Sequence, residues 1–139
     1  MISGSCLCGV VRFEITGEHS RIGICHCSLC RKASGVGSTA IIALAAARLT
    51  WVAGEDMVAQ YERPSGYGVS FCRNCGSPAP DPDSRRTMYR VPVGLLDGNP
   101  PLPVGDHIYV GSKASWDEIG DDAPQYDGDG SDRPRDQVA

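Results

Sequence analysis

The sequence predicts a single, mostly β domain built from antiparallel strands. Short apolar or alternating runs recur at close spacing, and 17 glycines and 10 prolines interrupt them within 139 residues. Such frequent breakers favour short strands over long helices. A chain of this length fits one domain with a modest core, which a bound metal would reinforce.

The expected strands follow one another along the chain. The first is the alternating run 10–15, and the second is 22–26. The apolar run 39–44 is compatible with a strand or a helix, because its alanines leave both open. Further strands are expected at 49–52, 57–61, 69–72, 88–93 and 107–110. The proline-rich segment 97–103 indicates a loop.

Negative charge gathers at the C-terminal end. The net charge is −4, and residues 117–136 hold eight acidic side chains against two arginines. This composition predicts a folded domain over residues 1–120 and an acidic, poorly ordered tail over 121–139. Neither part carries the basic stripe that nucleic-acid binding needs, and no apolar run reaches the length of a membrane span. The oligomeric state is left open.

The N-terminal residues predict a cytoplasmic location. They form a short uncharged segment that leads directly into a cysteine pair, unlike a secretory signal. In a reducing compartment, clustered cysteines bind metals or take part in catalysis rather than forming disulfides. The odd count agrees, because seven cysteines cannot all pair within one chain.

The seven cysteines form three motifs that predict two zinc sites. A strand points residues i and i+2 to one side, and a C-x-x-C turn brings its two sulfurs together. Structural zinc takes four ligands, with Zn–S near 2.3 Å for thiolates, whereas catalytic zinc keeps one position open. The motifs are C-x-C at Cys6 and Cys8, C-x-C-x-x-C at Cys25, Cys27 and Cys30, and C-x-x-C-G at Cys72 and Cys75.

The spacing alone leaves the partition of these cysteines open. In the favoured arrangement, the first and third motifs share one structural zinc ion, and the middle motif holds a second, open one. The alternative joins Cys25 and Cys27 to the third motif. We favour the first arrangement because the middle motif already supplies three ligands locally.

Several polar residues lie next to the middle motif. His26 points away from the sulfurs if this segment is extended, so a packed or surface position is expected. His107 lies in a strand-like run, and a structural role is expected for it. Arg31 and Lys32 are candidate binding residues for a substrate carboxylate, with ordinary surface charge as an equal alternative.

Four segments resemble the motifs of the glutathione-dependent formaldehyde-activating enzymes. Residues 4–14 (Gly-Ser-Cys-Leu-Cys-Gly-Val-Val-Arg-Phe-Glu) are similar to the opening motif, and residues 25–35 (Cys-His-Cys-Ser-Leu-Cys-Arg-Lys-Ala-Ser-Gly) to the second. Residues 71–78 and 107–116 are similar to the third and closing motifs. The resemblance runs from about residue 4 to about residue 127 with the motifs in order.

The resemblance implies a β-tent fold, in which antiparallel sheets surround a structural zinc ion. It implies that the first and third motifs hold this ion and that Cys25, Cys27 and Cys30 hold a catalytic one. The implied activity is that of a carbon–sulfur lyase, which joins a small thiol, glutathione, reversibly to an aldehyde, formaldehyde. A non-catalytic zinc-scaffolded binding module and a thiol-based redox sensor are the alternatives.

One segment departs from the family's pattern. After the third motif the family continues into an apolar strand, whereas Ala79-Pro80-Asp81-Pro82-Asp83 follows here. Because proline donates no hydrogen bond to a sheet, we expect a loop or a sheet edge at this point.

Overall fold

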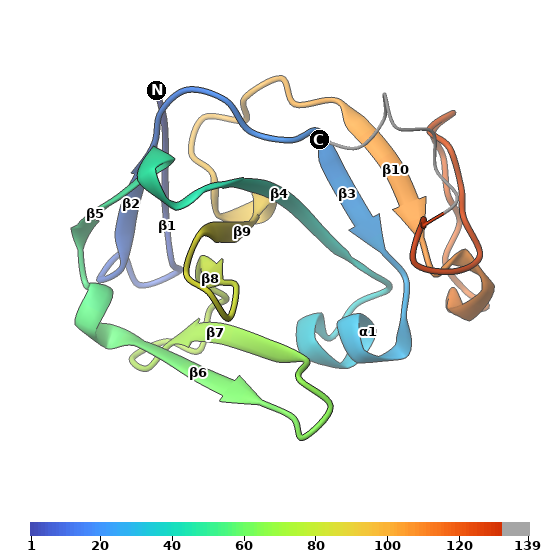
Figure 1. Ribbon diagram of the computed structural model, residues 1–139, viewed down its shortest axis with the longest axis horizontal. Helices are drawn as coiled ribbons and strands as arrows, with labels where there is room; N and C mark the ends of the chain where they lie inside the picture. The colour runs from blue at the N-terminus through green and yellow to red at the C-terminus, as the bar shows by residue number, and fades with distance from the viewer. Residues whose placement is uncertain (132–139) are drawn as a thin grey trace.

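The computed structural model describes residues 1–131, and these form three sheets and one α-helix (Figure 1). The three-stranded sheet has the order β1 (Ile2–Ser5), β2 (Arg12–Ile15), β5 (Leu49–Ala53). The five-stranded sheet has the order β10 (Val104–Ile108), β3 (Ile22–Cys25), β4 (Thr39–Ala45), β9 (Met88–Pro92), β8 (Asp81–Pro82). The third sheet pairs β6 (Val58–Glu62) with β7 (Gly68–Cys72).

The helical elements are short. The α-helix, α1 (Ser28–Ser34), lies between β3 and β4. The 3-10 turns of the described chain are η1 (Ala46–Arg48), η2 (Glu55–Met57), η3 (Val93–Leu95) and η4 (Val110–Ser112). None of these helices has the length and apolar character needed to cross a membrane.

This architecture confirms the predicted mostly β, single-domain fold. The run 39–44, which the sequence left open, is a strand. Two elements were missed in the sequence. The first, β1, has little apolar alternation in Ile-Ser-Gly-Ser. The second, α1, is too short to show helical periodicity, although the left-handed Gly35 at its C-terminal end is a typical stop signal.

The five-stranded sheet is mixed rather than antiparallel throughout. β10 lies parallel to β3, with Ile108 opposite Cys25, whereas the other strand pairs of this sheet are antiparallel. Parallel neighbours need a long connection, and most of the chain separates β3 from β10. β10 begins earlier than the sequence predicts and ends at Ile108, because Tyr109 has a left-handed backbone (φ 53°).

The main core lies where β2 and β5 pack against β4 and β9. Its fully buried side chains alternate along the strands, as at Phe13 and Ile15 and again at Ile42 and Leu44. This alternation is the period that a sheet buried on one face requires. Trp51 packs edge-on against the Phe13 ring, with 6.4 Å between ring centroids.

The proline-containing segment forms a sheet edge, as its prolines predict. β8 pairs with β9, with Asp81 opposite Arg90, and is the last strand of its sheet. Pro82 therefore needs no hydrogen-bonding partner on its outer side.

Part of the expected acidic tail is attached to the domain. The N–H of Tyr126 donates to the carbonyl of His107 (2.9 Å), and the N–H of Val110 donates to the carbonyl of Tyr126 (3.0 Å). These bonds extend the folded part beyond the boundary expected at residue 120, because the backbone of 124–128 satisfies groups at the edge of β10. Residues 132–139 of the expected tail lie outside the described residues.

Candidate metal centre

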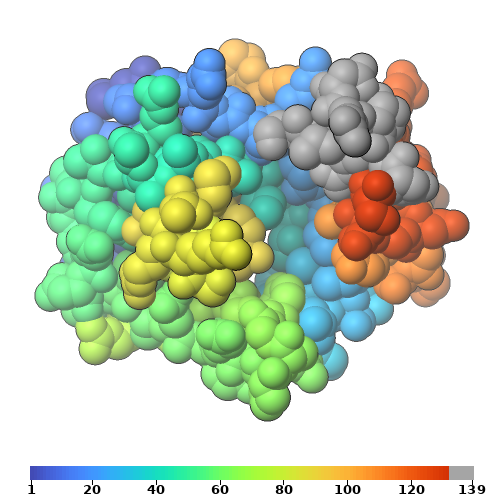
Figure 2. Space-filling view, in the orientation of Figure 1, coloured from blue at the N-terminus to red at the C-terminus, as the bar shows by residue number. Residues whose placement is uncertain are grey.

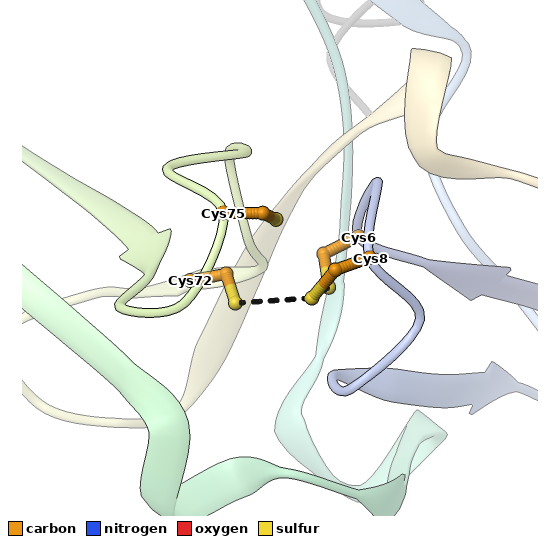
Figure 3. Close-up of side chains that lie close together, drawn as sticks. All are labelled: Cys6, Cys8, Cys72 and Cys75. Atoms are coloured by element: carbon orange, nitrogen blue, oxygen red, sulfur yellow. Dashed lines mark hydrogen bonds between the residues drawn. The ribbon is translucent and has the colours of Figure 1, made fainter.

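The first and third cysteine motifs meet to form a four-cysteine cluster, Cys6, Cys8, Cys72 and Cys75, whose sulfurs all lie within 4.8 Å of one another (Figure 3). The Sγ atoms of Cys6 and Cys8 are 3.5 Å apart, and those of Cys8 and Cys72 are 3.9 Å apart. Thiolates about 2.3 Å from a tetrahedral zinc ion have S···S edges of about 3.8 Å. The cluster therefore has the spacing that a four-thiolate metal site requires.

Turns, rather than strand pleats, aim these sulfurs at one another. Cys6 and Cys8 lie in the turn between β1 and β2, where the N–H of Gly9 donates to the carbonyl of Cys6 (3.1 Å). The expected strand geometry for this pair is therefore wrong. Cys72 ends β7, and the N–H of Gly76 donates to its carbonyl (2.8 Å) with Gly76 at φ 75°. This is the tight turn that C-x-x-C-G predicts.

The four-cysteine cluster lies at the junction of two sheets. Cys6 and Cys72 are buried with Val11, whose N–H donates to the Cys6 sulfur (3.3 Å). Cys8 is exposed, and hydrogen bonds from Asn74 and from the Val10 backbone lower its pKa to about 6. Burial raises the pKa of Cys72. The cluster joins the β1–β2 turn to the end of β7, which suits a structural metal.

Cys25, Cys27 and Cys30 form a second group, the three-cysteine cluster, whose sulfurs also lie within 4.8 Å of one another. Cys25 ends β3, Cys27 caps the N-terminus of α1, and the N–H of Cys30 donates to the Cys27 sulfur (3.3 Å). The helix cap thus orients one sulfur toward the other two. Tyr67, from the loop between β6 and β7, donates its hydroxyl to the Cys30 sulfur (3.4 Å).

Hydrogen bonds between the thiols of this cluster shift their pKa values in opposite directions. A hydrogen bond from Cys25 lowers the pKa of Cys30 to about 5, helped by Thr39 and Tyr67. The same bond, together with burial, raises the pKa of Cys25. Burial and the contact with Cys30 raise the pKa of Tyr67, which keeps its hydroxyl protonated as a donor.

Among the described residues, no histidine or carboxylate joins the three sulfurs at ligand distance. His26, only 2% exposed, turns away from them, and its Nε2 lies 2.8 Å from Nδ1 of His107. His107 Nε2 in turn lies 3.0 Å from both carboxylate oxygens of Asp121. Burial and the neighbouring His107 lower the pKa of His26. The packed position expected for His26 is confirmed, whereas the structural role expected for His107 stays a prediction.

A cavity of about 700 Å³ opens beside the three-cysteine cluster, and all three of its cysteines line it. The molecular face in Figure 2 is hollowed between the yellow segment around the β8–β9 turn and the blue region that includes α1. The segment 79–83, which departs from the family's pattern, also contributes to the cavity wall through Ala79 and Asp81. This departure from the family's pattern therefore lies directly at the candidate site.

Arg31 and Lys32 are not among the described residues that line this cavity. Both lie in the last turn of α1, where basic side chains complement the helix dipole. Their expected contact with a substrate carboxylate stays a prediction. Tyr67 and Asp121 were missed in the sequence, since their contacts join segments far apart in the chain.

Both donor sets fit metal ions. All seven cysteines are free, and the 3.5 Å between Cys6 and Cys8 is far longer than the S–S bond of a disulfide, about 2.05 Å. Clustered thiolates are the donors preferred by zinc, copper(I) and iron–sulfur centres. The grouping is that of the favoured partition, and it excludes the alternative that joins Cys25 and Cys27 to the third motif.

Comparisons with known proteins show which family this chain resembles. A family model described as "Glutathione-dependent formaldehyde-activating enzyme" matches residues 1–112. A protein of Halomonas elongata named "Putative glutathione-dependent formaldehyde-activating enzyme" is 29% identical over 127 residues, covering 86% of this chain and 81% of that protein. A crystal structure of a Rhodobacter sphaeroides protein is similar, with TM-score 0.54 and 25% identity, covering 71% of this chain and 91% of the other. On the extent of the family match, the chain belongs to the family of glutathione-dependent formaldehyde-activating enzymes.

Proposed function

We propose that this protein is a zinc-dependent enzyme that joins a small thiol reversibly to an aldehyde, with glutathione and formaldehyde as the reference pair. One observation carries the proposal: three cysteines, with no fourth side-chain ligand among the described residues, open into a cavity of about 700 Å³. A metal held there would keep a position for substrate. The family's name supports a thiol and an aldehyde as reactants.

The two clusters would hold zinc in different roles. The four-cysteine cluster would hold a structural ion, whose binding adds directly to the folding free energy. The three-cysteine cluster would hold the catalytic ion, and when bound this ion would lower the pKa of a substrate thiol, making a thiolate available at neutral pH.

The chain's own residues prepare the site for this reaction. Tyr67 and the backbone N–H of Cys30 donate hydrogen bonds to two of the sulfurs, which orients them and spreads their negative charge. The apolar walls at Leu29 and Ile108 limit water around the reacting atoms.

The reaction balances without an oxidant or reductant. The thiol loses its proton, its sulfur bonds to the carbonyl carbon, and the carbonyl oxygen takes up a proton. The reverse reaction breaks the same carbon–sulfur bond, which is the basis for proposing a carbon–sulfur lyase.

Free cysteines in both clusters support a reducing, cytoplasmic setting.

Exchange spectroscopy by proton NMR tests this proposal. Glutathione and formaldehyde exchange with their adduct, and zinc-loaded protein at micromolar concentration is expected to accelerate the exchange. Cys27→Ser, which leaves the four-cysteine cluster complete, should remove the acceleration. If wild-type protein leaves the exchange rate unchanged, glutathione and formaldehyde are not its reactants. If it also accelerates no other pairing of a thiol with an aldehyde, the chain is a zinc-scaffolded binding module instead.

A further inference from the structure

Apart from its cysteines, the described lining of the cavity beside the three-cysteine cluster offers no uncompensated charge to an anionic substrate. Among the described residues that line it, Arg90 is the only cation and Asp81 the only carboxylate. Their side chains form an ion pair with each other. Asp81 also accepts a hydrogen bond from the Ser70 hydroxyl (2.7 Å). The single positive charge is therefore already compensated within the protein.

The walls around the cluster are largely apolar. Leu29 comes from α1, Ile41 from β4, Val69 from β7 and Ile108 from β10, so the apolar lining arises from four different elements. A carboxylate placed in this cavity would lose hydration and would find neutral hydroxyl donors, such as Ser38 and Ser112, but no uncompensated cation among the described lining residues. Glutathione brings two carboxylates and an ammonium group into any site that it enters.

We propose that the thiol selected by this site carries an uncharged, apolar substituent, and that glutathione binds it weakly. The inference rests on the proposed function, because a thiol whose sulfur reaches the three-cysteine cluster must place its substituent in the cavity. Apolar walls favour the burial of an apolar group in proportion to the apolar area removed from water. The cavity, at about 700 Å³, has room for an aromatic ring or a short alkyl chain together with an aldehyde.

Isothermal titration of the zinc-loaded, full-length protein tests this preference, with metal content checked before and after. The probes are benzyl mercaptan, glutathione and the small anion 2-mercaptoethanesulfonate. Benzyl mercaptan is expected to bind at least ~10-fold more tightly than either anionic thiol, as burial of one ring predicts. Equal or tighter binding of glutathione would overturn the inference and leave the proposed function standing. Absence of binding by every thiol would overturn both.

A variant pair ties the preference to the cavity wall. Leu29 is half-buried on α1, so a long side chain at this position can extend its charged end toward solvent. Leu29→Lys should add an uncompensated cation to the wall. The ratio of the glutathione dissociation constant to that of benzyl mercaptan should therefore fall by about 10-fold. Leu29→Met, the matched control, should keep the wild-type ratio. An unchanged ratio in Leu29→Lys would show that wall charge does not select the thiol.

Discussion

At the scale of single residues, cysteine side chains lie in two different environments. Cys72 is fully buried in a small core cluster with Cys6 and Val11. Cys27 is half-buried, caps a short helix and faces the cavity. Loss of a metal ligand should therefore damage folding in the first environment and substrate binding in the second.

Substitution by serine separates these roles. Cys72→Ser should lower the soluble yield and release the structural metal, because metal binding there contributes to folding free energy. Cys27→Ser should keep the wild-type melting temperature within a few degrees and lose one metal equivalent. Metal analysis together with thermal melting measures both effects. Equal loss of folding in the two variants would contradict the separation of roles.

Gly4 illustrates a packing constraint at one residue. An added Cβ there would lie 2.4 Å from the Phe13 ring and 2.9 Å from the Leu95 carbonyl oxygen. Gly4→Ala should therefore destabilise the protein by roughly 1–3 kcal/mol, as overpacked cores do. Gly94→Ala is the matched control, since its Cβ would meet no atom within 4 Å. Urea unfolding of both variants checks this, and similar midpoints would contradict it.

At the scale of elements, one carboxylate organises the turn between β8 and β9. Asp83 accepts hydrogen bonds from the N–H groups of Thr87 (2.7 Å) and Met88 (3.1 Å) and from the Thr87 hydroxyl (2.9 Å). The Met88 backbone N–H is the main reason why the pKa of Asp83 is lowered, and the contacts with Thr87 add to it. The ionised form of Asp83 therefore stabilises the turn between β8 and β9.

The sign of this pKa shift predicts a pH dependence. A carboxyl group whose pKa is lower in the folded state contributes stability above its unfolded pKa, near 3.9, and loses it as pH falls through the folded pKa. The difference in unfolding free energy between wild type and Asp83→Asn should therefore be largest above about pH 5 and shrink toward pH 2–3. Chemical denaturation at each pH measures it. A difference that stays constant with pH would contradict the role of the carboxylate.

At the scale of the whole molecule, the four-cysteine cluster connects the three-stranded sheet to the β6–β7 pair. An isolated two-stranded sheet is only marginally stable in water. β6 and β7 therefore depend on this connection and on the core around Val11 and Met57. β4, at the centre of the five-stranded sheet, has strand neighbours on both sides.

Metal removal should thus destabilise β6 and β7 more than β4. After chelation, the backbone amides of β6–β7 should exchange with deuterium well before those of β4, because local opening follows local stability. Hydrogen exchange measured by mass spectrometry, with and without chelator, tests this expectation. Cys27→Ser should keep β6–β7 protected as in the wild type. A uniform loss of protection in both regions would contradict the structural role of the cluster.

The sequence predicted those structural features that depend only on residues a few positions apart. The turn at Gly76 and the edge position of β8 follow from the conformational limits of glycine and proline within a few residues. The strand 39–44 stayed open because alanine favours neither state there. The helix α1 was missed because it is too short to show periodicity. The strand β10 was expected, but its parallel direction was not, because strand direction depends on the whole intervening chain.

The sequence by itself determined which residues can hold metal, because motif spacing brings cysteines two or three positions apart within reach of one ion. Only the tertiary structure decided which motifs join. Cys8 meets Cys72 across 64 positions, and Tyr67 meets Cys30 across 37. It also decided that the walls beside the three-cysteine cluster are apolar, with Arg31 and Lys32 elsewhere. Contacts of this range are set by how the sheets pack and close long loops, which no local periodicity records.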